Sequence, residues 1–501
     1  MWIRWPIAHR PRTDLRFTLL AGSLIAVAKV LLTVHFMTRY GWDRDELYFI
    51  EAARHPALGY VDFPPVTAWI GWLVLHTAGA SLLWLRMTGQ LAGGIAVVLV
   101  ALIARDLGGG RGAQAAAAAA WAVTPFALGA GSIFHPTQFD SVVWVALSWI
   151  VLRVLQGGGI RWYVALGICA GIGLETKYTV AVFLAALAFA VVLSPKRRLL
   201  WSRGMAVATA IAVALVVPNL AWQAGHDWAS VRFYPSQEAK TASDTPRPAY
   251  VAEGLAFLGG TAVLAAAGIV SLWRRRELRP LAVAPAAVVA LYFLARGRAY
   301  YPVPGLALPA AAGTIAAAGW LSHRSARRIA AAAALVVVHA AVLVVALPLV
   351  VPVLPTSTMV HRGIWDTSFY GDELGWQEMT ADVQHVWLRV PGADRASTVV
   401  LAGNYGEAGA LAHFGHGLPP VVSGHLSWQY WAPQPLTQRW AITVGYDRTW
   451  AATICDSWRA VTRVTNRWHV GNEEQGRWVG WCHLRAPLGR LWQSRIARFT
   501  L

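Results

Sequence analysis

Hydrophobic residues along this chain are grouped in runs that are long enough to form membrane-spanning helices. Such a helix needs roughly 20 mostly apolar residues, and about eleven segments approach that length. They are 17–37, 86–105, 113–131, 139–155, 162–176, 178–194, 204–222, 252–272, 281–295, 303–320 and 328–349. After Pro355 the pattern changes, and residues 356–501 are polar, varied and rich in Trp. The pattern predicts a polytopic α-helical membrane domain at 1–355 and a soluble domain at 356–501.

In the soluble segment, strand-like and helical stretches alternate as in an α/β domain. Its strand-like stretches are 397–404, 419–425, 439–447 and 477–484, and the stretch 407–415 is helical in character. Three glycines between Gly403 and Gly409 are spaced GxxGxxG rather than GxGxxG, which favours close packing at a turn over a nucleotide site. Cys455 and Cys482 lie in this segment, where they either form a disulfide or remain buried thiols.

The composition supports the membrane interpretation. Hydrophobic residues make up 56% of the chain and charged residues only 14%, whereas soluble domains carry about 25% charged residues. These proportions exclude a disordered protein, a coiled coil and an ordinary cytosolic enzyme. The net charge of +18 raises the alternative of nucleic acid binding. The arginines are dispersed over many loops and form no single stripe, so no nucleic acid partner is expected.

The distribution of basic residues predicts the orientation in the membrane. The apolar segment 66–80 follows Pro64-Pro65 and is short for a crossing, so it either spans or lies flat in the interface. If it lies flat, every short loop on one side is basic, beginning with Arg4, Arg10, Arg12 and Arg16 and ending with the loop that contains Arg324. Because cytoplasmic loops carry such an excess, we expect a cytoplasmic N-terminus and an external loop 38–85. An odd number of spans then places 356–501 outside as well.

Several ionisable residues are expected together on the outer face. They are Asp45 and Glu46 after the first span, Asp62 in the same loop, Asp140, Lys177, His226, and Arg296 and Arg298 with Tyr301. Ionisable groups at membrane depth are costly and usually functional. Each also has a plainer explanation: charge at a helix N-terminus for the Asp45–Glu46 pair, snorkelling for Lys177, headgroup contact for the arginines, and solvent exposure for His226. The mixed signs on one face predict a cavity for an anionic, lipid-borne substrate.

Five motifs of this chain resemble one family of membrane enzymes. The first is DRDELYFIEAARHPALGYVDFPP, which has an acidic pair at Asp45-Glu46 and a Gly-Tyr-x-Asp-x-Pro-Pro stretch around Asp62; the others are FHPTQFDSVVW, GLETKYTVAVF, PNLAWQAGHDWAS and GRAYYPVPGLALP. In this order they resemble the protein O-mannosyltransferase-like glycosyltransferases of family 39, which have the GT-C fold and include bacterial aminoarabinose transferases of lipid A. Phe63 departs from the family pattern.

The resemblance implies a reaction and roles for the candidate residues. A polyprenyl-phosphate sugar would be the donor, and a glycan, lipid or protein the acceptor, on the outer face of a bacterial cytoplasmic membrane. Asp45 is the candidate general base, and Glu46 is better placed to support the structure. Lys177, Arg296 and Arg298 are the cations expected at the donor phosphate, with Tyr301 as a hydrogen-bond donor. Asp140 and Asp62 are the next candidates for the base.

Other functions and a metal remain as alternatives from the sequence. Asp62 and His226 are a candidate ligand pair for zinc or another divalent cation, although two ligands do not specify a metal. A transporter or flippase for lipid-linked sugars is the competing function, but it would place ionisable groups near the bilayer midplane and show inverted repeats. A non-catalytic binding subunit is the third hypothesis, and it would tolerate the loss of Asp45.

Overall fold

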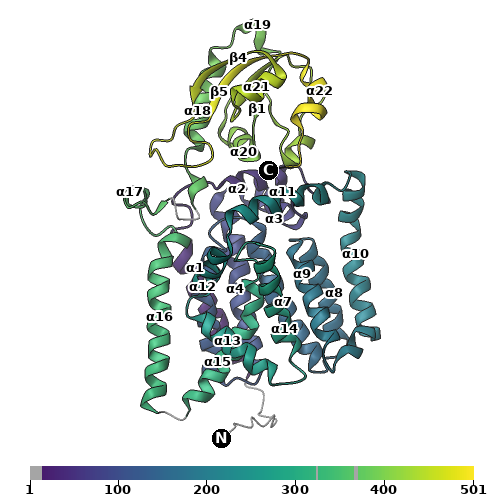
Figure 1. The fold of residues 1–501 in the computed structure, drawn as a ribbon, viewed down its shortest axis with the longest axis vertical. Coiled ribbons are helices and arrows are strands. Elements are labelled where there is room, and N and C mark those ends of the chain that lie inside the picture. Colours follow the sequence, from purple (N-terminus) through teal and green to yellow (C-terminus); the bar gives the residue numbers. More distant parts are fainter. Residues whose placement is uncertain (1–13, 323–324, 366–369, 501) are drawn as a thin grey trace.

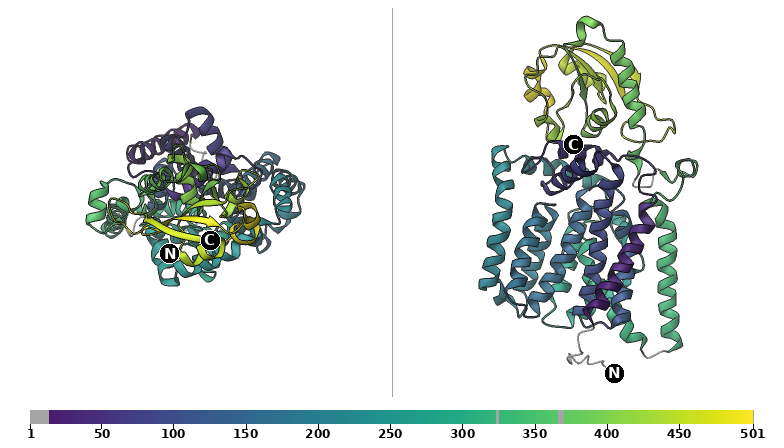
Figure 2. Two further views of the ribbon diagram at one scale, coloured as in Figure 1. Left: turned by 90° about the horizontal axis from the view of Figure 1, so that it is seen from above. Right: turned by 180° about the vertical axis from the view of Figure 1, so that it is seen from behind.

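The computed structural model describes residues 14–322, 325–365 and 370–500, and it has two parts (Figures 1 and 2). A long bundle of helices forms one part, and a smaller sheet with helices around it lies at one end of the bundle. The first described residues lie at the opposite end of the bundle (Figure 1). Of the basic residues used to orient the chain, Arg4, Arg10, Arg12 and Arg324 lie outside the described residues.

Within the described ranges, six helices are long and apolar enough to cross a membrane. They are α1 (Leu15–Val34), α4 (Leu82–Asp106), α7 (Pro136–Leu155), α10 (Arg203–Gly225), the stretch Val303–Leu321 that joins η2 (Val303–Leu306) to α15 (Ala307–Leu321), and α16 (Ala326–Val350). Shorter apolar helices are α3 (Val66–Ala78), α8 (Ile160–Leu174), α9 (Thr179–Val192) and α14 (Pro280–Leu294). All the segments predicted to span therefore contain helices.

Two of the predicted spans are not single straight helices. The segment 252–272 is divided into α12 (Arg247–Leu258) and α13 (Thr261–Trp273), which are bent by 94° to one another. The break falls at Gly259, whose φ of +54° is accessible to glycine at little cost. The segment 113–131 is divided into α5 (Arg111–Ala122) and α6 (Pro125–Gly129), because Thr124 caps a new helix that begins at Pro125.

Small residues allow helices of the bundle to approach closely. A Cβ at Gly268 in α13 would lie 1.7 Å from the carbonyl oxygen of Pro309 in α15, and one at Gly313 would lie 1.8 Å from that of Leu264. The two helices therefore pack backbone to backbone, as is typical of helix pairs in membranes, where small residues replace the hydrophobic effect as the basis of association.

Short helices cover the end of the bundle that faces the sheet. They are α2 (Arg44–Arg54), α3 and α11 (Ala229–Asp244), which lie together near the C-terminal part in Figure 1. Helix α3 is the segment for which the sequence predicts an interfacial position. Its 13 residues are too few for a full crossing at 1.5 Å per residue. Helix α3 lies beside α2, and its position in the membrane interface stays a prediction.

The C-terminal part contains a five-stranded sheet in the order β2-β1-β3-β5-β4. Its strands are β1 (Thr398–Ala402), β2 (Val421–Ser423), β3 (Trp440–Val444), β4 (Cys455–Arg463) and β5 (Trp478–Leu484). Strands β2, β1 and β3 are parallel, and β5 is antiparallel to both β3 and β4. The helices here are α17 (Thr356–His361), α18 (Trp376–Leu388), α19 (Gly392–Arg395), α20 (Tyr405–Phe414), α21 (Arg448–Ile454) and α22 (Leu488–Leu491). The α/β prediction is confirmed, but the sequence did not predict β4.

A disulfide joins Cys455 and Cys482, with 5.7 Å between their Cα atoms. It connects the first residue of edge strand β4 to the neighbouring strand β5. The structure contains the disulfide rather than two buried thiols. The bond closes a loop between cysteines that are 27 positions apart in the sequence. In the chain-entropy picture a loop of this length stabilises the folded state by about 3–4 kcal/mol.

Candidate active site

Most of the predicted site residues line one cavity of about 640 Å³ between the end of the bundle and the C-terminal part. Its walls come from α2, α11, the loop between α14 and η2, and the start of α20. Of the predicted residues, those that line it are Asp45, Asp62, Lys177, Arg296, Arg298 and Tyr301. Glu46, Asp140 and His226 do not line this cavity.

Asp45 is presented to the cavity by the first turn of α2. Asp43 caps this helix by accepting a hydrogen bond from the Asp45 backbone N–H at 2.8 Å. One Asp45 oxygen accepts a hydrogen bond from the Tyr405 hydroxyl at 2.9 Å, and the other lies 3.5 Å from His135 Nε2. Because a third of the side chain is exposed, a substrate in the cavity can reach the carboxylate.

The surroundings of Asp45 favour a carboxylate that accepts protons readily. Burial raises the pKa of Asp45 above its usual value, while the hydrogen bond from Tyr405 and the charge of Arg44 oppose that shift. His135 Nδ1 accepts from the Thr137 backbone N–H at 3.1 Å, so a neutral ring carries its proton on the nitrogen that faces Asp45. Burial and the charge of Lys177 lower the pKa of His135 to about 3, which keeps the ring neutral.

Glu46 points away from the cavity and is fully buried. Its two oxygens accept hydrogen bonds from Arg86, Nε at 2.7 Å and Nη2 at 2.6 Å, and from the backbone N–H groups of Phe134 and Asp43. Arg86 also contacts Glu373 of the C-terminal part at 3.0 Å. Glu46, which the sequence grouped with the catalytic candidates, is therefore a structural centre that joins α2, α4 and η4 (Gly371–Glu373).

Glu373, the second carboxyl group in contact with Arg86, makes the stability of the protein depend on pH. Burial raises the pKa of Glu373 from 4.5 to about 8, although Arg86 opposes the shift. A carboxyl group that is more basic in the folded state contributes stability below pH 4.5, and this contribution is lost as the pH rises through about 8. Glu373→Gln cannot ionise and is spared this loss. We expect its Tm in detergent, relative to wild type, to increase between pH 5 and pH 8.5; a constant difference would contradict the shift.

Lys177 lies over two tyrosines at the entrance to α9. Its Nζ donates to the Thr137 hydroxyl at 2.8 Å and lies 4.7 Å and 5.3 Å from the ring centres of Tyr301 and Tyr300. Cation–π contacts of this length hold an ammonium group in place without neutralising its charge. Lys177 therefore keeps its charge available to a phosphate in the cavity.

Asp140 lies near the start of α7, and its side chain is enclosed by protein. It is 2% exposed, and its oxygens accept from Trp144 Nε1 at 2.8 Å and from the Thr179 hydroxyl at 3.1 Å. These contacts tie α7 to the start of α9. The prediction of Asp140 as an alternative base is not supported, because its carboxylate is already occupied and does not line the cavity.

The two arginines reach the cavity from the loop that follows α14. Arg298 donates to Asp244 at 2.9 Å, and its side chain remains 31% exposed. Arg296 has a φ of +52°, a conformation that costs a non-glycine residue about 1–3 kcal/mol and is common at functional sites. Together with Lys177 they place three cations on the wall of a cavity that also contains Asp45.

Asp62 and His226 do not form the metal site that the sequence suggested. Asp62 accepts a hydrogen bond from the Tyr48 hydroxyl at 2.7 Å, and burial raises its pKa to about 7. His226 stacks on Trp222 with 3.9 Å between ring centres and lies outside the cavity. Among the described residues, no three His, Cys, Asp or Glu side chains are grouped so that they could hold a metal ion.

The sequence did not predict the cavity residues that come from the C-terminal part and from α11. Tyr405, at the start of α20, donates to Asp45 from 360 positions away in the chain. Lys240 of α11 lines the same cavity and contacts Glu473 at 3.3 Å. The one local signal for Tyr405 was its position directly after a strand, in Gly403-Asn404-Tyr405, where the start of a helix faces the carboxyl edge of the sheet.

Comparisons with known proteins show which family and fold this chain resembles. Residues 62–222 match the model of the dolichyl-phosphate-mannose-protein mannosyltransferase family. The lipid A galacturonosyltransferase RgtD of Rhizobium johnstonii (strain DSM 114642 / LMG 32736 / 3841) is 25% identical over 190 residues, 38% of this chain. The matched region spans only 40% of that relative's length.

Two solved membrane enzymes have similar structures. ArnT from Cupriavidus metallidurans in the apo state matches with a TM-score of 0.60 and 15% identity over 93% of this chain and 98% of its own. The Archaeoglobus fulgidus oligosaccharyltransferase in complex with Zn and sulfate matches with a TM-score of 0.53 and 13% identity, over 85% of this chain and 68% of its own. The chain therefore has the GT-C fold that its motifs predict, with a small C-terminal sheet.

Proposed function

We propose that this protein transfers a sugar from a polyprenyl-phosphate donor to an acceptor hydroxyl at the outer face of the bacterial inner membrane. The observation that carries the proposal is one cavity whose wall contains the Asp45 carboxylate together with Lys177, Arg296 and Arg298. Such a cavity supplies both a base and cations for a leaving phosphate. The related family of mannosyltransferases, and the relative that transfers galacturonic acid to lipid A, support the same chemistry.

The reaction we propose is one displacement at the anomeric carbon. The acceptor oxygen forms the new bond to this carbon while the bond between the carbon and the phosphate oxygen breaks. Asp45 takes the proton of the acceptor hydroxyl. The electron pair of the broken bond leaves with the lipid phosphate, whose charge is stabilised by Lys177 and the two arginines. Attack opposite to the leaving group inverts the anomeric configuration.

An adjoining apolar cavity has room for the beginning of the prenyl chain. It has a volume of about 180 Å³ and is shared with the first cavity through Asp45, His135 and Tyr300. The rest of its wall includes Phe126, Phe257 and Val350. Because an apolar chain beside a charged phosphate is the defining feature of a polyprenyl-phosphate donor, the pair of cavities fits that substrate class better than a water-soluble nucleotide sugar.

Lys177→Ala is the test of the donor site. We expect this variant to bind undecaprenyl phosphate about tenfold more weakly than wild type, since it loses one charge-assisted contact. Lys196→Ala is the matched control, because Lys196 follows the far end of α9 and contacts Glu277 instead. Binding is measured by titrating undecaprenyl phosphate into the purified protein in nanodiscs. Equal affinities of wild type and Lys177→Ala would contradict the donor assignment.

A purified, non-vesicular sample also distinguishes transfer from transport. A flippase moves its lipid between two leaflets and produces no new glycosidic bond. A transferase in nanodiscs releases undecaprenyl phosphate from the glycosylated lipid when an acceptor is present. Release that requires acceptor supports the enzyme, and its absence alongside lipid translocation in sealed vesicles would support the transporter.

The orientation in the membrane has its own test. We propose a cytoplasmic N-terminus and an external domain at 356–501. In a background without Cys169, a cysteine in place of Tyr430, which is 40% exposed, should react with a membrane-impermeant thiol reagent in intact cells. A cysteine in place of Arg198, near the other end of the bundle, should react only after lysis. The reverse result would invert the proposed orientation.

A further inference from the structure

A groove of about 340 Å³ lies along the edge of the bundle that α8, α9 and α10 form (Figure 1). Its wall also includes part of α7 and the short helix η1 (Arg197–Trp201), which joins α9 to α10. Of the described residues that line it, Thr209 alone has a polar side chain. Ala188 of α9 and Val213 of α10 line the groove and are exposed, so it opens to the surrounding lipid.

The groove is elongated, as the binding site of a hydrocarbon chain must be. On α10 its lining residues recur along one face of the helix, at Met205, Thr209, Ala212, Val216 and Leu220. The distance from Met205 to Leu220 along the helix axis is about 22 Å at 1.5 Å per residue. This exceeds the depth of one leaflet, which is about half of the 30 Å hydrocarbon core. An acyl chain can therefore lie along the groove.

One end of the groove adjoins a cluster of basic residues, at the end of the bundle away from the sheet (Figure 1). Leu199 and Leu200 of η1 line the groove. The basic residues around these two leucines are Lys196, Arg197, Arg198 and Arg203. The side chain of Trp201 is 90% exposed. Because tryptophan is enriched at the level of the lipid headgroups, η1 lies where a lipid in the groove would place its phosphate.

The arginines of this cluster are available to a phosphate. Lys196 contacts Glu277 at 3.7 Å. No described residue forms an ion pair with Arg197, Arg198 or Arg203, and all three are exposed. A guanidinium group can donate two parallel hydrogen bonds to phosphate oxygens. The end of the groove therefore offers positive charge that the described part of the protein does not neutralise.

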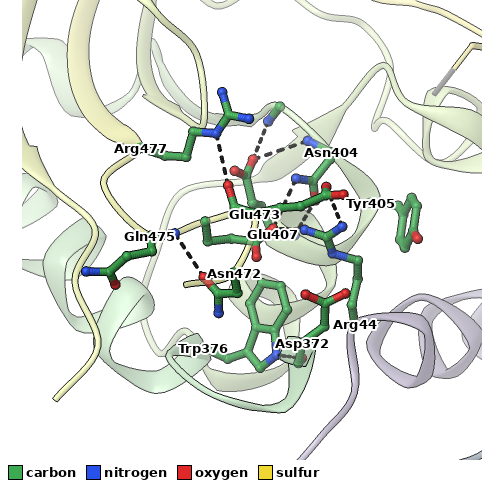
Figure 3. Close-up of polar contacts among 12 residues, drawn as sticks. Arg44, Asp372, Trp376, Asn404, Tyr405, Glu407, Asn472, Glu473, Gln475 and Arg477 are labelled. Carbon is green, nitrogen blue, oxygen red and sulfur yellow. Dashed lines mark hydrogen bonds and ion pairs between the residues drawn. The ribbon is translucent and has the colours of Figure 1, made fainter. Parts of the chain in front are cut away.

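A cluster in the C-terminal part shows the opposite arrangement. Figure 3 shows Arg44 reaching from α2 to Glu473, with which it pairs at 2.5 Å, and Arg44 also pairs with Glu474. The Glu407 carboxylate accepts a hydrogen bond from the Asn404 backbone N–H at 3.2 Å. These charges are satisfied by one another, whereas the arginines around η1 are left for a ligand.

We propose that the groove binds an anionic phospholipid, with an acyl chain along α10 and the phosphate on the arginines around η1. Basic residues at pockets between membrane helices recur as sites for anionic headgroups. In the orientation proposed above, this lipid belongs to the cytoplasmic leaflet. The site lies at the opposite end of α9 from Lys177 and is separate from the donor cavity. The bound chain fills space between helices and so supports α9.

Two phospholipids with identical chains test the headgroup site. Dioleoyl phosphatidylglycerol and dioleoyl phosphatidylcholine are titrated into the full-length protein in detergent, and bound lipid is counted by native mass spectrometry. We expect the anionic lipid to bind about tenfold more tightly, and Arg197→Gln combined with Arg198→Gln to abolish this preference. Arg111→Gln combined with Arg327→Gln is the control. It removes two exposed charges from α5 and α16, which do not line the groove.

The groove itself is tested by filling it. Ala212→Phe places a ring among the lining residues and should weaken the binding of both lipids by about tenfold. Ala214→Phe is the matched control, because Ala214 is exposed on another face of α10 and does not line the groove. An unchanged helical circular dichroism spectrum shows that a variant is folded, and the arginine variants decide the question should Ala212→Phe not fold.

Each result supports the proposal or overturns it. Equal affinity of the wild type for the two lipids, or a preference that persists without Arg197 and Arg198, overturns the headgroup site. Unchanged affinity in Ala212→Phe, or an equal loss in Ala214→Phe, overturns the groove as the chain site. Displacement of phosphatidylglycerol by an equal concentration of undecaprenyl phosphate would assign the groove to a prenyl chain instead. None of these results depends on Asp45 or Lys177, so the proposed function is tested separately.

Discussion

Asp45→Asn is expected to lower the turnover of sugar transfer by about 10²–10⁴-fold, the usual contribution of a general base. Asparagine keeps the shape of the side chain and can still accept the hydrogen bond from Tyr405, but it cannot take a proton. Undecaprenyl phosphate binding should stay close to that of wild type, since the cations of the donor site are untouched. The measurement is acceptor-dependent release of undecaprenyl phosphate at saturating substrates.

The control for this variant is Asp62→Asn, which changes a second carboxylate on the same cavity. Asp62 accepts from Tyr48 rather than from the residues around Asp45, so its loss should cost far less turnover. If Asp45→Asn retains near wild-type turnover while Asp62→Asn does not, the base is Asp62. If neither variant loses turnover, no carboxylate on this cavity is the base, and the proposed general-base mechanism fails.

Arg86→Ala is expected to have the largest effect on stability. Arg86, Glu46 and Glu373 have fully buried side chains, and the guanidinium neutralises Glu46 while it also donates a hydrogen bond to Glu373. Removing one member of a buried ion pair costs about 3–5 kcal/mol, because the remaining charge has no solvent around it. The free energy of unfolding in detergent, followed by tryptophan fluorescence, should fall by that amount.

A surface arginine provides the comparison for Arg86. Arg279 is only partly buried and donates to the backbone oxygen of Trp273 at 2.8 Å, so Arg279→Ala should change stability by less than about 0.5 kcal/mol. Arg86→Ala should also reduce turnover, because Glu46 adjoins Asp45 on α2. Wild-type stability in Arg86→Ala would show that the buried cluster does not hold α2 in place.

The sequence was sufficient for the positions of helices and for the face on which the candidate residues lie. The fold class is confirmed because long apolar runs are local signals that need no tertiary information. The same signals could not show which way a side chain turns within a helix. Asp140 opens α7 on the correct side, yet it points to Trp144 and Thr179 rather than into the cavity.

The contributions of the C-terminal part could not be predicted because they depend on contacts between distant segments. Tyr405 and Glu373 reach Asp45 and Arg86 across 360 and 287 positions of the chain. Strand β4 was missed for a different reason. It is an edge strand with polar residues such as Asp456 and Arg459 exposed on it, so its sequence lacks the apolar alternation of a half-buried strand.

The contact between α2 and α20 has a consequence for exchanging parts between related enzymes. A Cβ at Gly406 would lie 2.5 Å from the Arg44 side chain, and one at Gly409 would lie 2.7 Å from the backbone oxygen of Leu47. These two helices fit one another only with glycine at both positions, and they come from opposite halves of the chain. A hybrid protein that takes its C-terminal segment from a relative must therefore inherit the matching α2 as well, so α20 and the helix that carries Asp45 are exchangeable only together.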